Sequence, residues 1–121
     1  MNRNDFVETD GYFSVKVNGI EIFISSKEMS DKLVLLAKNV LAEYPKKIAE
    51  IAEYISQEKW FSDTYNLEKE EIAAKLRTPV IRIHEGGGLL SFCENEIDSG
   101  HILDVYFAGV LEKFYEVAMD G

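Results

Sequence analysis

The fold of this chain is decided by its C-terminal stretch, Thr78–Gly121, which reads TPVIRIHEGGGLLSFCENEIDSGHILDVYFAGVLEKFYEVAMDG. Four short runs rich in Val, Ile, Phe and Tyr are separated by glycines, a pattern typical of antiparallel strands joined by turns. Gly86-Gly87-Gly88 stands between two such runs and lacks the Lys and Ser or Thr of a phosphate-binding loop, so it predicts a turn. The stretch therefore predicts a four-stranded antiparallel meander.

Alternation within the last two runs assigns side chains to the two faces of this meander. His101 opens the third run, and we expect it to share the apolar face of this run. The other members of that face are Leu103, Val105 and Phe107. In the fourth run, the two expected faces are Tyr115, Val117 and Met119 on one side and Phe114, Glu116 and Ala118 on the other.

A hairpin is predicted near the N-terminus, where Tyr12–Val17 and Ile20–Ile24 flank Asn18-Gly19. Asn-Gly is a strong hairpin signal because both central residues of a type I′ turn need positive φ. The hairpin is expected to join the sheet of the meander or to extend its edge. Residues 1–10 are polar and are expected to be frayed.

The middle of the chain predicts helices. Ser25 and Glu28 fit a capping box, and apolar residues then recur at helical spacing as far as Tyr44. Pro45 is expected to break or kink this helix, and a second helix is expected to run to about Gln57.

An aromatic connector at 60–65 is expected to lead into a short helix over Leu67–Leu76, with Asn66 as its N-cap. Helices between strands at both ends are typical of an α+β fold, in which the helices pack on one face of an antiparallel sheet. We therefore predict one domain over residues 1–121. It contains an N-terminal β-hairpin, two to three central helices and a C-terminal four-stranded antiparallel meander.

Composition and charge limit the possible functions. The chain has 121 residues, 46% of them hydrophobic, which suits one globular domain. Its net charge of −9 argues against direct nucleic-acid binding, which needs clustered Lys and Arg. No apolar run is long enough to span a membrane, and the N-terminus lacks the pattern of a signal peptide. These features favour a cytoplasmic protein without membrane or nucleic-acid partners.

The negative charge is concentrated in the meander. From Thr78 onward, eight acidic residues stand against two basic ones, a balance of −6. The first 77 residues carry 14 acids and 11 bases, a balance of −3. Acidity of this size commonly serves solubility alone. Its uneven distribution predicts that the sheet end of the molecule carries the negative field.

Two histidines and one cysteine are the candidates for chemistry. His101 is predicted to be a structural, hydrogen-bonded residue, because it stands at the head of an apolar strand face. The alternative is a nucleophile pair of Cys93 with His101. His84 and His101 have no spacing that would add a third metal ligand, and a single cysteine allows no internal disulfide. No metal and no cofactor are therefore expected.

Three carboxylates, Glu94, Glu96 and Asp98, stand at every second position before the third strand. At this spacing they would line one side of an extended segment. The loop pattern of a calcium site is missing, and the sequence gives no geometry for a glycosidase pair. Solvated loop acids are the commonest explanation of such a segment, and an acidic patch that faces a partner is the next.

The pattern Gly100-His101-x-Leu103-x-Val105, followed by Gly109 and a final strand that ends at Gly121, covers roughly the last third of the chain. It resembles the C-terminal signature of a group of small bacterial proteins. Such proteins are often associated with the immunity proteins of polymorphic toxin and contact-dependent growth inhibition systems. The resemblance implies upstream helices and a toxin-binding role, and it carries over no catalytic role for His101.

The sequence therefore predicts a small binding protein, not an enzyme, that neutralises a cognate toxin domain expected to be basic and of the nuclease type. Four carboxylates and an aromatic anchor are expected to form its partner-binding surface. The residues predicted for this surface are Glu94, Glu96, Asp98, Asp104, Tyr106 and Trp60. Gly100, His101 and Gly109 are predicted to be structural. The alternatives are a small-ligand-binding or hydrolytic domain that uses His101 and nearby carboxylates, or a general protein-interaction module.

Overall fold

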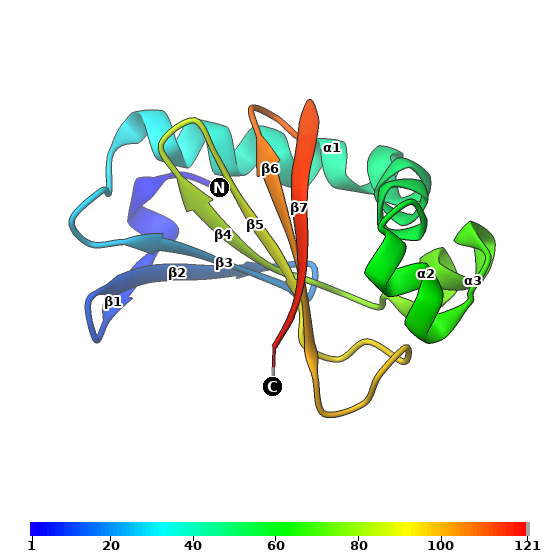
Figure 1. Ribbon diagram of the computed structural model, residues 1–121. Coiled ribbons are helices and arrows are strands. Elements are labelled where there is room, and N and C mark those ends of the chain that lie inside the picture. Colours follow the sequence, from blue (N-terminus) through cyan, green and yellow to red (C-terminus); the bar gives the residue numbers. More distant parts are fainter. Residues whose placement is uncertain (121) are drawn as a thin grey trace.

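The computed structural model describes residues 1–120, which form a seven-stranded sheet and three α-helices (Figure 1). The strands are β1 (Val7–Thr9), β2 (Tyr12–Val17), β3 (Ile20–Ser25), β4 (Val80–His84), β5 (Gly87–Phe92), β6 (Ile102–Ala108) and β7 (Lys113–Asp120). The helices are α1 (Asp31–Ser56), α2 (Lys59–Tyr65) and α3 (Lys69–Lys75), after a 3-10 turn at Arg3–Asp5. The architecture is α+β, as predicted.

The spatial order of these seven strands follows their order in the chain. Neighbouring strands are antiparallel, but β3 and β4 run parallel. The crossover between β3 and β4 contains all three of the helices described, and such a connection returns the chain in its original direction. The predicted meander is present as β4–β7. It is not a separate sheet, because the N-terminal strands extend it through β3.

The N-terminal hairpin forms at the predicted turn and gains one strand. Asn18 and Gly19 have positive φ values of 51° and 83°, as a type I′ turn requires. The prediction of a frayed N-terminus is wrong for β1, which pairs with β2. Asp10 and Gly11 form a second turn with positive φ, and Asp-Gly is itself a hairpin signal that the prediction overlooked.

Helix α1 runs unbroken through Pro45 for 26 residues, so the predicted break there is wrong. Pro45 is exposed, and the turns on either side of it bury one apolar stripe. Such tertiary burial outweighs the local cost of a helical proline, about 3 kcal/mol. The N-cap is Ser30, whose Oγ accepts a hydrogen bond from the backbone N–H of Leu33. Ser25, the predicted cap, is the last residue of β3.

The segment after α1 is more helical than predicted. The expected connector at 60–65 lies within α2, and α3 begins at Lys69 with Glu68 as N-cap, two residues later than expected. Phe61 is fully buried in the core, whereas Trp60 keeps 39% of its surface exposed. In the part of the chain that the structure describes, no helix has the length and apolar composition needed to cross a membrane.

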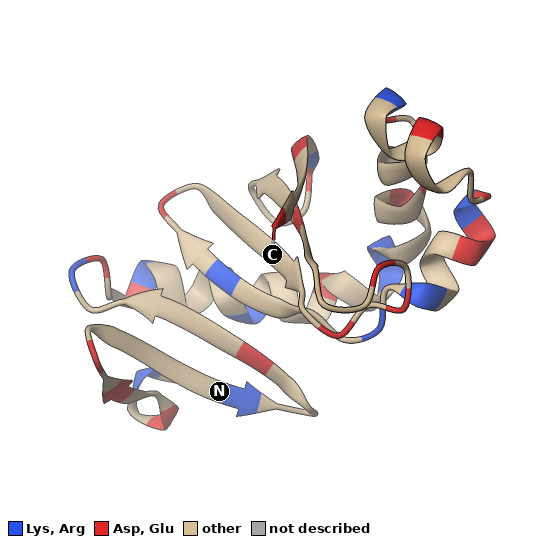
Figure 2. Cartoon of the chain, turned by 60° about the horizontal axis from the view of Figure 1, so that its bottom comes forward, with Lys and Arg blue, Asp and Glu red and all other residues tan. Residues whose placement is uncertain are grey.

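The core lies between the helices and one face of the sheet (Figure 1). The inward side chains of β4–β7 that are buried are Ile81, Ile83, Leu90, Phe92, Leu103, Val105, Phe107 and Val117. The predicted apolar face of the third run is therefore confirmed for Leu103, Val105 and Phe107. On the opposite face, no helix within residues 1–120 covers the sheet, and Figure 2 looks onto this side, with α1 behind the strands.

Candidate functional site

The uncovered side of β4–β7 is the candidate functional surface, and we call it the open face. Residues directly opposite each other in antiparallel strands point to the same side. Arg82 pairs with Leu89, Leu89 with Tyr106 and Ser91 with Asp104. The open face is defined by the side chains of Arg82, Leu89, Ser91, Asp104, Tyr106, Tyr115, Glu116 and Asp120.

A β-bulge brings an additional aromatic residue to this face. Tyr106 pairs with Glu116, but the next residue of β6 pairs with Phe114, so Tyr115 is one residue extra. A bulge interrupts the alternation of side chains, so that two successive residues can point to the same side. Tyr115 consequently lies with Glu116 on the open face, where its ring centroid is 6.0 Å from that of Tyr106.

The bulge also reverses the predicted faces at the start of the fourth run. Phe114, predicted to share a face with Glu116, packs inward on Tyr54 of α1, with ring centroids 5.8 Å apart. Tyr115, predicted to share a face with Val117, is 55% exposed, whereas Val117 is buried. Within β7, the side chains therefore depart from strict alternation between the two faces only at the bulge.

Asp104 is a buried carboxyl on the open face, although the sequence predicts it as part of an exposed patch. It is 6% exposed, and its Oδ1 has no hydrogen-bond partner within residues 1–120. Burial raises the pKa of Asp104, and the carboxyl of Asp120 raises it further. The Ser91 hydroxyl and the Arg82 guanidinium act in the opposite direction. Asp104 is thus held where its negative charge is poorly compensated.

The surroundings of Tyr106 are negative. Burial raises the pKa of its hydroxyl, and the charges of Asp104, Glu116 and Asp120 raise it further. Tyr115 acts in the same direction. A phenolate forms less readily in a negative field, so the effects of the three carboxylates, unlike that of burial, report the sign of the local potential. The paired tyrosine rings therefore lie in a field that favours a cation.

The N-terminal side of the open face is different, because it holds a positive charge. The Arg82 guanidinium lies 5.1 Å from the centroid of the Phe23 ring in β3, a cation–π contact.

Cys93 is exposed directly after β5. Partial burial of its thiol is the largest cause of a raised Cys93 pKa, and the Asp104 charge raises this pKa further. A raised thiol pKa lowers the fraction of thiolate, which is the reactive form.

A hollow of about 230 Å³ opens beside the tyrosine pair. Its lining includes His84, Gly87, Tyr106, Ala108 and Tyr115. Gly87 is part of β5 and not of the turn that the three successive glycines predict. A Cβ at Gly87 would lie 2.3 Å from a backbone oxygen of β6, so the strands approach each other closely here. The small residues at this point leave the hollow free between the aromatic side chains.

The β5–β6 loop, residues 93–101, carries the other predicted acids and is held by one buried side chain. The Asn95 amide nitrogen donates to the backbone oxygens of Phe92 (2.8 Å) and His101 (3.0 Å). Its amide oxygen accepts from the backbone N–H groups of Ile97 (3.0 Å) and Asp98 (2.9 Å). Asn95 is 4% exposed. It therefore fixes the course of the loop from inside.

The carboxylates of this loop contact the helical end of the molecule. Glu96 forms an ion pair with Arg77 at 2.6 Å, and its backbone N–H donates to Lys75. The Tyr65 hydroxyl donates to Asp98, and this bond is the largest cause of a lowered Asp98 pKa and a Tyr65 pKa raised to about 12. Figure 2 shows the red segments of this loop next to blue segments at the end of α3.

His101 does not share the apolar strand face, so that expectation is wrong. Strand β6 begins at Ile102, and His101 belongs to the preceding turn, where its side chain is 47% exposed. Its Nδ1 lies 3.0 Å from the carboxylate of Asp98. Gly100 and Gly109, predicted to be structural, occupy turns and have positive φ values of 92° and 64°.

The structure divides the predicted partner-binding residues between two regions. Asp104 and Tyr106 lie on the open face, and Glu94 lies near it, lining a 140 Å³ hollow with residues of β3 and β4. The other three, Glu96, Asp98 and Trp60, lie toward the helices. Tyr115, Glu116 and Asp120 were not predicted as neighbours of Tyr106, and no signal in a single sequence marks the bulge that brings Tyr115 there.

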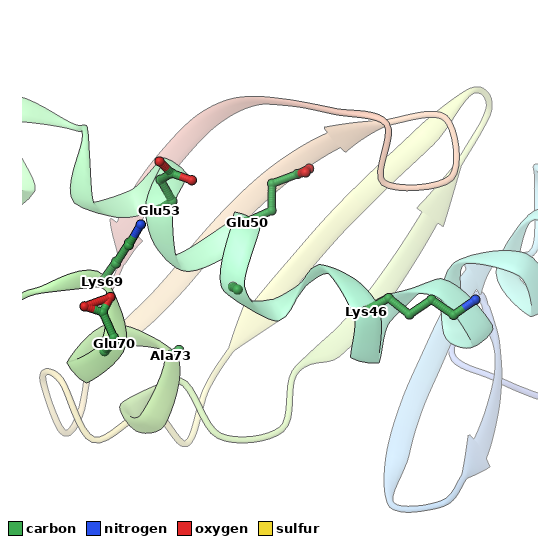
Figure 3. Close-up of a pocket in the computed structure, with 7 residues that line it drawn as sticks. Lys46, Glu50, Glu53, Lys69, Glu70 and Ala73 are labelled. Atoms are coloured by element: carbon green, nitrogen blue, oxygen red, sulfur yellow. The ribbon is translucent and has the colours of Figure 1, made fainter.

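A larger groove of about 350 Å³ lies between α1 and α3 (Figure 3). Two lysines and three glutamates line it, together with two alanines. Figure 3 shows the Lys69 side chain pointing toward Glu53 and the Lys46 side chain pointing away from the group. Because both signs of charge are present, this groove favours no particular charge in a ligand.

Comparisons with known proteins identified no relative of this chain. No protein-family profile, curated protein sequence or solved structure matches the chain.

Proposed function

We propose that this protein is a small acidic binding protein that neutralises a toxin domain by covering it with the open face. One observation carries the proposal: two tyrosine rings, Tyr106 and Tyr115, lie together among carboxylates on a side of the sheet that no helix within residues 1–120 covers. The resemblance of the last third of the chain to immunity-associated proteins supports the choice of a toxin as the partner.

The two kinds of side chain have different roles in this proposal. Exposed tyrosines supply large, rigid contact area, and they are enriched among the residues that dominate binding energy. Carboxylates steer a basic partner toward the face and raise the association rate. A nuclease domain must hold a phosphate backbone with basic residues. Carboxylates on an inhibitor can occupy the position of those phosphates, so a basic nuclease-type domain is the partner we propose.

The experiment combines protection with kinetics. A toxin domain found encoded by a neighbouring gene is expressed with this chain and without it, and association of the purified pair is measured at about 0.1 M and 1 M salt. The Debye length falls from ~10 Å to ~3 Å over that range, so association should slow strongly. Glu116→Lys with Asp120→Lys should slow it about tenfold or more, within the range of electrostatic steering.

A matched control has the same change in net charge on another surface. Glu53→Lys with Glu70→Lys alters two exposed carboxylates on α1 and α3. This control should slow association much less than the open-face pair. Equal effects of the two pairs would contradict recognition through the open face, and failure to protect against the neighbouring toxin would contradict the immunity function.

One observation favours a second candidate, a hydrolytic or small-ligand-binding domain. The exposed His101 imidazole is oriented by Asp98, which in turn accepts a hydrogen bond from Tyr65. A positioned imidazole of this kind can act as a general base. Hydrolysis of p-nitrophenyl acetate above the rate in buffer, lost in His101→Ala but kept in His84→Ala, would support this candidate. Equal rates for both variants and the unaltered protein would remove it.

A further inference from the structure

The hollow beside Tyr106 and Tyr115 has the size of a site for one side chain. Its volume, about 230 Å³, lies below the ~300–1,000 Å³ typical of sites that enclose a whole small molecule. Gly87 and Ala108 pair across β5 and β6 and contribute little bulk there. The two tyrosine rings, 6.0 Å apart with 42° between their planes, form an aromatic wall. A flat or slender group can therefore enter the hollow beside the rings.

The charges around this hollow select the sign of that group. Glu116 stands next to Tyr115 in β7 and directly opposite Tyr106 in β6, and it is exposed. Asp104 and Asp120 lie further along the same face, and the Oδ1 of Asp104, itself on a side chain 94% buried, has no hydrogen-bond partner among residues 1–120. The basic residue Lys113 is exposed at the start of β7 and pairs with Ala108 beside the hollow, so one positive charge stands against the three carboxylates of this face.

The remaining charged groups at the hollow are already engaged. His84 Nδ1 lies 3.3 Å from the carboxylate of Glu28, and Glu85 forms an ion pair with Lys32 of α1. Both of these pairs join the β4–β5 turn to the chain segment that enters α1. They leave the tyrosine rings, the Glu116 carboxylate and the Lys113 ammonium as the groups available to a ligand at this point.

We propose that this hollow receives one arginine side chain of the partner protein, which stacks on the Tyr106 and Tyr115 rings and faces the Glu116 carboxylate. The inference rests on the proposed function and names the subsite that anchors the partner. A guanidinium is planar and weakly hydrated, and it stacks on aromatic rings, so it suits the hollow better than the strongly hydrated ammonium of lysine. The occupant is thus an arginine on a protein surface.

The test begins with the full-length protein alone and three short peptides. Acetyl-Gly-Arg-Gly-amide is titrated into the isotope-labelled protein while backbone amide signals are followed. Its lysine and citrulline counterparts serve as controls. The arginine peptide should shift the amides of Gly87, Tyr106 and Ala108 with a dissociation constant of about 1 mM. Citrulline, which keeps the shape and lacks the charge, should give no saturable shift.

Two variants locate the site. Tyr115→Leu should weaken the arginine peptide at least about fivefold, and Glu116→Gln should weaken it to a smaller extent. Tyr12→Leu is the matched control, since Tyr12 is 47% exposed and in β2, away from the hollow. Equal binding of the arginine and citrulline peptides, equal binding of the arginine and lysine peptides, or equal losses in Tyr115→Leu and Tyr12→Leu would each overturn the assignment.

The same variants with the toxin domain separate this inference from the proposed function. Tyr115→Leu should raise the dissociation constant of the toxin complex at least about tenfold, with Tyr12→Leu close to the unaltered protein. Neutralisation that is insensitive to Tyr115→Leu would overturn the arginine subsite and leave the immunity function standing. Arginine-peptide binding at the hollow without any binding of the toxin would overturn the immunity function and leave the chemistry of the hollow standing.

Discussion

Two acidic regions of the C-terminal half differ in what their carboxylates contact. In the β5–β6 loop, Glu96 pairs with Arg77, and Asp98 accepts hydrogen bonds from Tyr65 and His101. On the open face, Asp104 has an oxygen without a partner, and Glu116 is exposed beside two tyrosines. The loop acids are used within the fold, whereas Glu116 on the open face remains available to a partner and the buried Asp104 stays without full compensation.

This difference shows that the position of a charge in the sequence does not give its role. Both regions contribute to the same balance of −6 over residues 78–121. An ion pair inside the molecule cancels its own distant field, and an unpaired carboxylate does not. The surface that carries unpaired negative charge is therefore smaller than the sequence indicates, and it is centred on β6 and β7.

The largest effect should come from the side chain that holds the loop. Asn95→Ala removes four hydrogen bonds from a buried position and leaves backbone groups without partners. The free energy of unfolding should fall by about 3 kcal/mol, measured by urea denaturation. Ser99→Ala, at an exposed position in the same loop, should change it by less than about 0.5 kcal/mol. Similar small losses in both variants would show that the loop is not held from inside.

Much of the fold could be predicted from the sequence because period-two alternation and turn residues are local signals. The meander and the Asn18-Gly19 hairpin follow from these signals alone. Other features depend on contacts between distant segments. Pro45 stays helical because the turns around it are packed against the sheet, and the loop acids find partners in Tyr65 of α2 and in Arg77, which follows α3; both are distant in sequence. The open face was predicted only through Asp104 and Tyr106, since the bulge at Tyr115 leaves no mark in the pattern.

The next effect tests whether Asp104 is an uncompensated buried charge. Asp104→Asn keeps the shape and removes the charge, and it should raise the free energy of unfolding at pH 7 by about 1 kcal/mol, the usual size of a single-substitution effect. The folded-state pKa of Asp104 is raised by burial and by Asp120. The Asp104 carboxyl therefore contributes most to the stability of the unaltered protein below its unfolded pKa of ~3.9. This contribution is lost as pH rises through the folded pKa.

The difference between Asp104→Asn and the unaltered protein should consequently disappear as pH falls below about 4. Urea denaturation at pH 7 and pH 3.5 measures it. A loss of stability at pH 7 would show that Arg82 and Ser91 stabilise the Asp104 carboxylate more than burial destabilises it. In that case Asp104 would belong with the loop acids that are used within the fold.

A smaller effect on stability, with the opposite pH dependence, is expected when Tyr65, the partner of the loop residue Asp98, is replaced. The Tyr65 hydroxyl bond lowers the pKa of Asp98, so its contribution is present above the unfolded pKa and is lost as pH falls through the folded pKa. Tyr65→Phe should reduce stability at pH 7 by less than Asn95→Ala does. In acid, the stability of Tyr65→Phe should become equal to that of the unaltered protein. Thermal unfolding at pH 7 and pH 3 measures this. A difference that persists unchanged in acid would assign the loss to packing of the ring.

The smallest effect concerns Glu96, and it separates the two acidic regions most directly. The Glu96 and Arg77 side chains are each more than half exposed, and exposed ion pairs typically contribute between 0 and about 1 kcal/mol. Glu96→Gln should therefore lower the free energy of unfolding by roughly 0.5 kcal/mol or less. Because its charge is already paired with Arg77, the same substitution should leave the salt-dependent association rate with the toxin domain almost unchanged. Glu116→Gln removes an equal charge from the open face and should slow association measurably. If Glu96→Gln slowed association as much as Glu116→Gln, the partner would contact the loop as well, and the division between the two acidic regions would not hold.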